Sequence, residues 1–72
     1  QKALSDYTES IKLNPQLAEA FHNRGLTYYQ LGQREQAVKE LQQAAELFSG
    51  QGKKDNAQKS INALRILQEN PD

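Results

Sequence analysis

The stretch Ala37–Leu47, which reads AVKELQQAAEL, repeats the apolar pattern of Ala3–Leu13, which reads ALSDYTESIKL, at an offset of 34 residues. Small and large apolar residues recur in matching places: Ala3 and Ala37, Leu4 and Val38, Tyr7 and Leu41, Ser10 and Ala44, Ile11 and Ala45, Leu13 and Leu47. Such a period is typical of helix–turn–helix units, which stack because one unit cannot bury its apolar face alone. The repeat therefore predicts an all-α fold of stacked antiparallel helix pairs.

The composition excludes several other classes of protein. The chain has 72 residues, enough for one small domain, and its 9 Lys and Arg balance its 9 Asp and Glu. This balance argues against nucleic acid or an anionic membrane as the main partner, because both require a positive field. Without cysteine the chain has no disulfide framework, thiolate metal site or cysteine nucleophile. No apolar run approaches the roughly 18 residues of a membrane span.

Apolar spacing and chain-breaking residues predict four helices, over about 1–13, 16–31, 34–49 and 53–69. Asn14-Pro15 should end the first helix, because the residue before a proline is pushed out of the helical region. We expect Asn14 to cap the second helix, with Pro15 at its first position. Gly32 should stop the second helix in a left-handed conformation, and the segment 50–52 should break the third.

Each predicted helix has an inward face of small or apolar residues. These faces are Ala3, Leu4, Tyr7, Ser10 and Ile11; Leu17, Ala20, Phe21, Arg24, Gly25, Tyr28 and Leu31; Ala37, Val38, Leu41, Ala44, Ala45 and Phe48; and Ala57, Ile61, Leu64 and Leu67. The last helix has a polar outer face, formed by Lys54, Gln58, Lys59, Asn62 and Arg65. Apolar residues on one side and polar residues on the other indicate a helix that caps the stack.

The second and third helices resemble the tetratricopeptide repeat family. That family has aromatic-x2-Leu-Gly-x2-Tyr in one helix, then Ala-x3-aromatic and a closing Pro in the next. This chain has Phe21-x2-Arg24-Gly25-x2-Tyr28, followed by Ala37-x3-Leu41 with Ala44 in the small-residue position, and the upstream copy has Ala3-x3-Tyr7, Ser10 and Pro15. Two residues depart from the pattern. Arg24 replaces an apolar residue, and we expect its stem to lie across the packing while its guanidinium reaches water; Ser49 stands in place of the closing Pro.

The resemblance implies a right-handed α-solenoid in three parts. Residues 1–15 would be the second helix of an incomplete repeat, 16–49 a complete repeat, and 50–72 a capping helix and tail. Because the chain has no initiator Met and starts within a repeat, we expect a C-terminal fragment of a longer protein. The sequence does not determine the compartment, for which the cytoplasm is the working expectation.

The resemblance also implies a function, since this family binds partner peptides or helices in a concave groove. The groove is lined by the first of the two helices in each repeat, called here the first-half helix. The resemblance places Glu19, His22, Asn23, Leu26, Tyr29 and Gln30 on that surface. An asparagine at the position of Asn23 grips the ligand backbone in several peptide-binding members, and its amide both donates and accepts. The alternative is that Asn23 bonds locally or to water. We expect His22 to face solvent and Tyr29 either to support a ligand or to remain plain surface.

Other functions have less support in the residues. The carboxylate clamp of chaperone-binding members needs Lys and Arg on first-half helices, where this chain has Glu19, His22 and Leu26. No nucleophile elbow, phosphate loop, cofactor motif or metal-ligand set is recognisable, so we expect no enzymatic activity, cofactor or metal. A structural alternative is an end-cap or self-association segment without a ligand of its own. In that case the apolar face of residues 3–11 would lie exposed and could form a homodimer.

Overall fold

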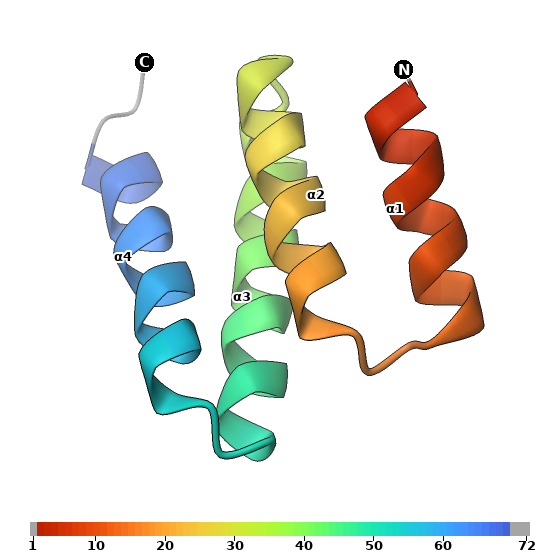
Figure 1. Cartoon of the computed structure of the whole chain (residues 1–72). Helices are drawn as coiled ribbons and strands as arrows, with labels where there is room; N and C mark the ends of the chain where they lie inside the picture. Colours follow the sequence, from red (N-terminus) through yellow and green to blue (C-terminus); the bar gives the residue numbers. More distant parts are fainter. Residues whose placement is uncertain (1, 70–72) are drawn as a thin grey trace.

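Four α-helices make up the computed structural model, which describes residues 2–69 (Figure 1). They are α1 (Lys2–Leu13), α2 (Ala18–Gln30), α3 (Arg34–Gly50) and α4 (Lys54–Glu69), and no strand occurs within these residues. The expected all-α fold is confirmed, and each helix boundary lies within two residues of its predicted place. Gln1 of the first predicted helix and residues 70–72 of the predicted tail lie outside the described residues.

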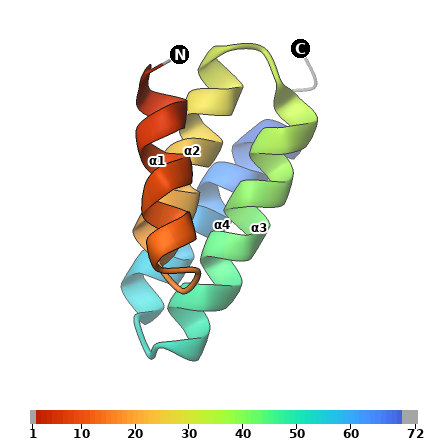
Figure 2. The same cartoon turned by 90° about the vertical axis from the view of Figure 1, so that its right-hand side faces the viewer.

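Consecutive helices run in opposite directions, and the centre of the molecule is the pair formed by α2 and α3 (Figures 1 and 2). Helix α1 packs against α2, and α4 packs against α3. The Cα atoms span 32 × 29 × 13 Å, so the stack forms a thin slab. Because direction alternates, α4 runs parallel to α2 (Figure 1). Helix α4 therefore has the direction of the first helix of a repeat. Its apolar spacing, however, copies that of α3, which is the second helix of a repeat.

Two clusters of buried side chains hold α2, α3 and α4 together. Near the lower end of Figure 1, Ala18 packs with Ala44, Phe48 and Ala57. Near the upper end, Ala37, Leu41 and Leu67 pack together with the half-buried Tyr28. The predicted inward face of α3 is confirmed, since Ala37, Leu41 and Ala44 are completely buried.

Gly25 allows the close approach of α2 and α3. A Cβ atom on Gly25 would lie 2.9 Å from the Leu41 Cγ, 3.2 Å from the Glu40 Cβ and 3.3 Å from the Ala37 carbonyl oxygen. The contact at 2.9 Å would force the Leu41 side chain to shift, and the other two are tighter than ordinary van der Waals contacts. Gly25 thus sets the spacing of the central helix pair, as the small residue at the helix crossing predicts.

The turns after α2 and α3 are built alike around two left-handed glycines. Gly32 has φ 82° and Gly52 has φ 75°, a conformation that side chains with a Cβ rarely adopt. In each turn the following amide donates back to the helix, Gln33 N to Tyr28 O over 2.9 Å and Lys53 N to Phe48 O over 2.8 Å. These bonds satisfy carbonyls that the helix ends would leave unpaired. The predicted stop at Gly32 is confirmed, and Gly52 has the same role after α3.

The predicted N-terminal cap of the second helix is wrong. Asn14 does not cap α2; its side-chain oxygen accepts from the Gln16 amide at 3.1 Å and its carbonyl accepts from Leu17 N at 3.1 Å. These two bonds close a turn over residues 14–17, so Pro15 stands in the turn and α2 begins at Ala18. The turn also brings Ala18 into the core, where its exposed fraction is 3%, a position that we did not predict.

Three further expectations about burial need correction. Leu31 and Ile61 were expected to face inward but are exposed, because Leu31 follows the end of α2 and the rotation of α4 turns Ser60 inward instead. Under the structural alternative, the apolar residues of α1 were expected to lie exposed. Ala3, Leu4, Tyr7 and Ile11 are instead half-buried, since α1 packs against α2. Within residues 2–69, no helix is both long and apolar enough to span a membrane.

Candidate functional site

Helix α2 presents the six predicted site residues along one side, as their spacing of three and four residues requires. Glu19, Asn23, Leu26, Tyr29 and Gln30 are exposed, and His22 is half-buried. Leu26 and Tyr29 keep 38% and 40% of their surface exposed and lie about one helical turn apart. This side of α2 therefore offers both polar and apolar groups to a partner.

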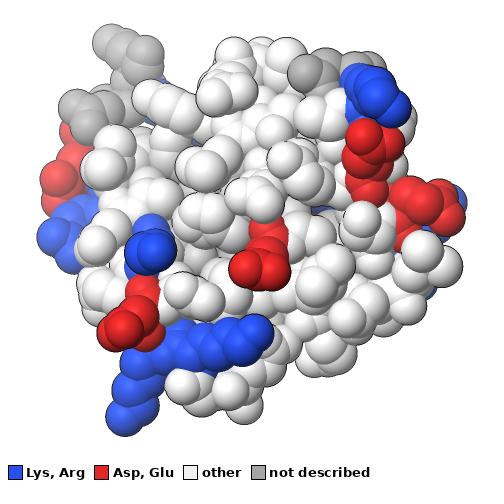
Figure 3. Space-filling model, viewed as in Figure 1, with Lys and Arg blue, Asp and Glu red and all other residues white. Residues whose placement is uncertain are grey.

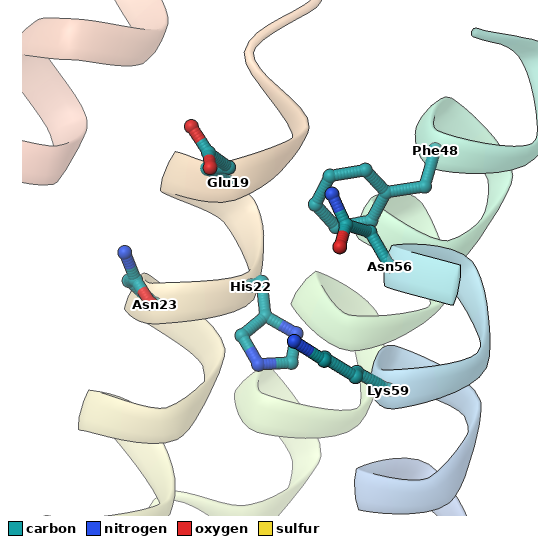
Figure 4. Close-up of a pocket in the computed structure, with 6 residues that line it drawn as sticks. All are labelled: Glu19, His22, Asn23, Phe48, Asn56 and Lys59. Atoms are coloured by element: carbon teal, nitrogen blue, oxygen red, sulfur yellow. The ribbon is translucent and has the colours of Figure 1, made fainter. Parts of the chain in front are cut away.

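A hollow of about 170 Å³ lies between the first halves of α2 and α4 (Figure 4). Its lining comes from three helices: Glu19, His22 and Asn23 of α2, Phe48 of α3, and Asn56 and Lys59 of α4. The structure thus brings three of the six predicted residues together. Leu26, Tyr29 and Gln30 lie further along α2, outside the hollow.

His22 contradicts the expectation of a solvent-facing side chain. Its ring points toward α4, where Nδ1 lies 2.8 Å from the Ser60 hydroxyl oxygen (Figure 4 shows the ring between α2 and α4). Ser60 has no exposed surface, so the bond satisfies a buried hydroxyl that would otherwise be costly. Sequence reasoning missed this pair because the two residues are 38 positions apart. One signal was present, since Ser60 is a small polar residue within the apolar spacing of α4.

The surroundings of His22 favour its neutral form. Burial of the ring lowers the pKa of His22 below its ordinary value of 6.5, and the positive charge of Lys59 lowers it further. In Figure 4 the Lys59 side chain extends toward the imidazole. At neutral pH the ring is therefore an uncharged wall of the hollow. The Ser60–His22 contact does not make a nucleophile, because a completely buried hydroxyl cannot reach a substrate.

Arg24 also differs from its expected position. Its Nε donates to the Glu40 carboxylate at 2.7 Å and its Nη1 donates to the Thr8 hydroxyl at 3.1 Å, so the guanidinium joins α3 and α1 and does not reach into water. The side chains of Arg24 and Glu40 are only 15% and 16% exposed. The charge that replaces an apolar residue is therefore neutralised inside the stack, next to the Phe21 ring at 5.7 Å.

Charge is distributed unevenly over this side of the molecule. Figure 3 shows a largely uncharged surface with an acidic group near its centre, while basic side chains and one further acidic group lie where α4 begins. Lys53 and Lys54 are exposed in that segment. Among residues 2–69, no three His, Cys, Asp or Glu side chains lie close enough to hold a metal ion. The groups that face the hollow are suited to hydrogen bonding and charge pairing with a partner.

Two family models match the chain. A model described as TPR repeat matches residues 1–32, and a model described as Tetratricopeptide repeat matches residues 18–51. Together they cover α1, α2 and α3. No curated protein and no solved structure matches the chain significantly.

Proposed function

The chain belongs to the tetratricopeptide repeat family, whose repeats generally act as protein-interaction modules, and we propose that it binds a peptide or helix of a partner along the exposed side of α2. The proposed contact residues are Glu19, His22, Asn23, Leu26, Tyr29 and Gln30. The observation that carries the proposal is the exposure of Leu26 and Tyr29 beside a polar hollow. Apolar anchors next to hydrogen-bonding groups are the usual composition of a protein-binding surface.

Each part of this surface has a distinct role in the proposal. Leu26 and Tyr29 supply apolar area, and Tyr29 loses little conformational entropy because it has few rotatable bonds. Asn23 supplies an amide that pairs with both the N–H and the carbonyl of a partner backbone. His22 is a positioning residue, since its bond to Ser60 joins the two helices that border the hollow. Affinity should be modest because the surface is short.

The family is typically a non-enzymatic scaffold, and we propose no catalytic role for this chain. We also retain the proposed division into residues 1–15, 16–49 and 50–72. The pairing of α2 with α3 around Gly25 supports a complete repeat over 16–49.

A titration followed by amide NMR, with a diverse pool of peptides, tests the binding proposal. We expect chemical-shift changes at Glu19, Asn23, Leu26 and Tyr29. Asn23→Ala should leave the unfolding temperature unchanged and weaken binding, because Asn23 is exposed. The matched control is Asn62→Ala on the outer side of α4. Equal affinity of the Asn23 variant and the unmodified protein would remove Asn23 from the site.

Self-association through α1 is the second candidate, because none of its residues is fully buried. Half-covered apolar residues on a terminal helix can bind a second copy. A dilution series separates the two candidates. Concentration-dependent shifts at Ala3, Leu4, Tyr7 and Ile11, with no response of α2 to peptides, would favour self-association.

A further inference from the structure

Helix α4 presents a row of residues to the same side of the molecule as the proposed site. Asn56 and Lys59 line the hollow. Ile66 follows Lys59 by seven residues, which is two helical turns, so it lies on the same face of α4 about 10 Å further along. Its side chain is 55% exposed. This face of α4 is thus polar at its start and apolar near its end.

The bond between His22 and Ser60 aligns this row with that of α2. The two helices run parallel (Figure 1) and rise equally per residue, so positions counted from His22 and from Ser60 remain level. Seven residues beyond each, Tyr29 is level with the end of α4 where Ile66 lies. Leu26, Tyr29 and Ile66, all exposed, therefore lie toward one end of the face that α2 and α4 share. Its other end is the polar hollow.

The charges of the polar end favour an acidic partner. The ion pairs among residues 2–69 are Lys2–Asp6 and Arg24–Glu40, so Lys59 has no carboxylate within pairing distance. Lys53 and Lys54 add two positive charges where α4 begins, against one negative charge from the exposed Asp55 (Figure 3). Glu19 opposes them within the hollow, but the amides of Asn23 and Asn56 can both donate to a carboxylate.

We propose that α4 is the second wall of the binding groove and that the partner segment carries an internal acidic side chain beside apolar ones. The acidic group meets Lys59, and the apolar side chains meet Leu26, Tyr29 and Ile66. The separation of about 10 Å corresponds to about three residues of an extended chain. This inference rests on the proposed function and adds the partner's chemistry and the residues of α4.

The test uses three short peptides with acetylated and amidated ends, so that neither carries a terminal charge. One has an aspartate three residues before a pair of leucines, the second has lysine in place of the aspartate, and the third has serines in place of the leucines. Amide NMR of the full chain should show the first peptide shifting Asn23 and Tyr29 on α2 together with Lys59 and Ile66 on α4. We expect the other two to bind at least about fivefold more weakly.

Matched variants test the two ends separately with the first peptide. Lys59→Gln should weaken binding about threefold and reduce its salt dependence, whereas Lys39→Gln, an exposed lysine of α3, should not. Ile66→Ser should weaken binding about fivefold. Ile61→Ser should have no effect, because Ile61 lies on another flank of α4 with 42% of its surface exposed.

The outcomes separate this inference from the proposed function. Shifts confined to α2, with equal affinity for the aspartate and lysine peptides, would overturn the inference and leave the proposed function standing. Much tighter binding of the first peptide with a free C-terminal carboxylate would show that the groove selects a chain end. That result would also overturn the inference of an internal acidic side chain. Absence of shifts on both helices with all three peptides would overturn the inference, and the proposed function would then be decided by the titration with the diverse peptide pool.

Discussion

Helices α1 and α3 carry nearly the same apolar pattern 34 residues apart, yet they differ in burial. Leu41 of α3 is completely buried, whereas Tyr7, at the matching position of α1, is half-buried. Ala37 and Ala3 differ in the same way. The reason is the number of neighbours, since α3 packs against both α2 and α4, whereas α1 packs mainly against α2.

The comparison shows that an amphipathic pattern predicts which face of a helix turns inward but not how deeply it is buried. In a stack of helices each layer is covered by the next, so stability is shared between neighbours and is lowest at the ends. The contribution of a residue to the free energy of unfolding should therefore depend on its layer more than on its type.

The largest expected effect on stability comes from adding a side chain at Gly25, where α2 and α3 approach each other closely. Gly25→Leu should abolish the folded state, because even a Cβ atom at this position would lie 2.9 Å from Leu41. Overpacking costs about 1–3 kcal/mol or more, and a domain of this size has only a few kcal/mol of stability. Circular dichroism during thermal unfolding measures the result.

Gly50→Leu is the control for this prediction, because a Cβ atom at Gly50 meets nothing within 4 Å and Gly50 has no positive φ. This variant should unfold cooperatively near the temperature of the unmodified protein. A similar cooperative transition in Gly25→Leu would show that α2 and α3 can separate without loss of the fold.

Alanine substitutions at matching positions of α3 and α1 measure how much more the buried helix contributes to the free energy of unfolding. Leu41→Ala should lower the free energy of unfolding by about 3 kcal/mol, because it leaves a cavity in a completely buried position. Tyr7→Ala should lower it by only about 1 kcal/mol, because the ring is half-buried. Urea denaturation of both variants provides the measurement. Equal losses would mean that α1 is as well supported as α3.

Arg24 tests whether α1 is held by a polar contact as well as by packing. Arg24→Ala should cost about 1–2 kcal/mol, because it leaves Glu40 with an unpaired charge at 16% exposure and removes the bond to Thr8. The double variant with Glu40→Ala should recover part of this loss. Additive losses in the two single variants would indicate that the pair contributes no coupling energy.

The smallest expected effect is a pH dependence of the contact between α2 and α4. Burial lowers the pKa of His22 in the folded state, so the unfolded chain takes up its proton first as the pH falls. The stabilising contribution is therefore complete above pH 6.5 and is lost as the pH falls from that value through the lower folded pKa. Lys59 and Glu19 are the charged groups beside the ring.

Urea unfolding between about pH 7.5 and pH 5.5 isolates this effect, because other side chains titrate little in that range. The chain has one histidine, so His22→Gln is the matched control and should remove the dependence. An unmodified protein that becomes more stable with acidification would contradict the lowered pKa.

The exposed side of α2 could be predicted from the sequence more fully than the hollow. Helical spacing places Glu19, Asn23 and Tyr29 on one side of a helix whatever packs behind it, although their role in binding stays a prediction. Asn56 and Lys59 could not be assigned to the hollow, because their proximity to His22 depends on the angle at which α4 packs. His22 was expected to face solvent for the same reason, since its bond to Ser60 also depends on how α4 packs.

The sequence by itself determined the four helices and the two glycine turns after α2 and α3, because helical periodicity and the left-handed glycines act within a few residues. Only the tertiary structure decided which matching positions are buried and which polar groups meet. Leu41 is more deeply buried than Tyr7 at the matching position. His22 bonds to Ser60, and Arg24 bonds to both Thr8 and Glu40. All of these features have one physical reason. Burial and pairing depend on groups that lie far away in the chain, and these come together only when the helices stack.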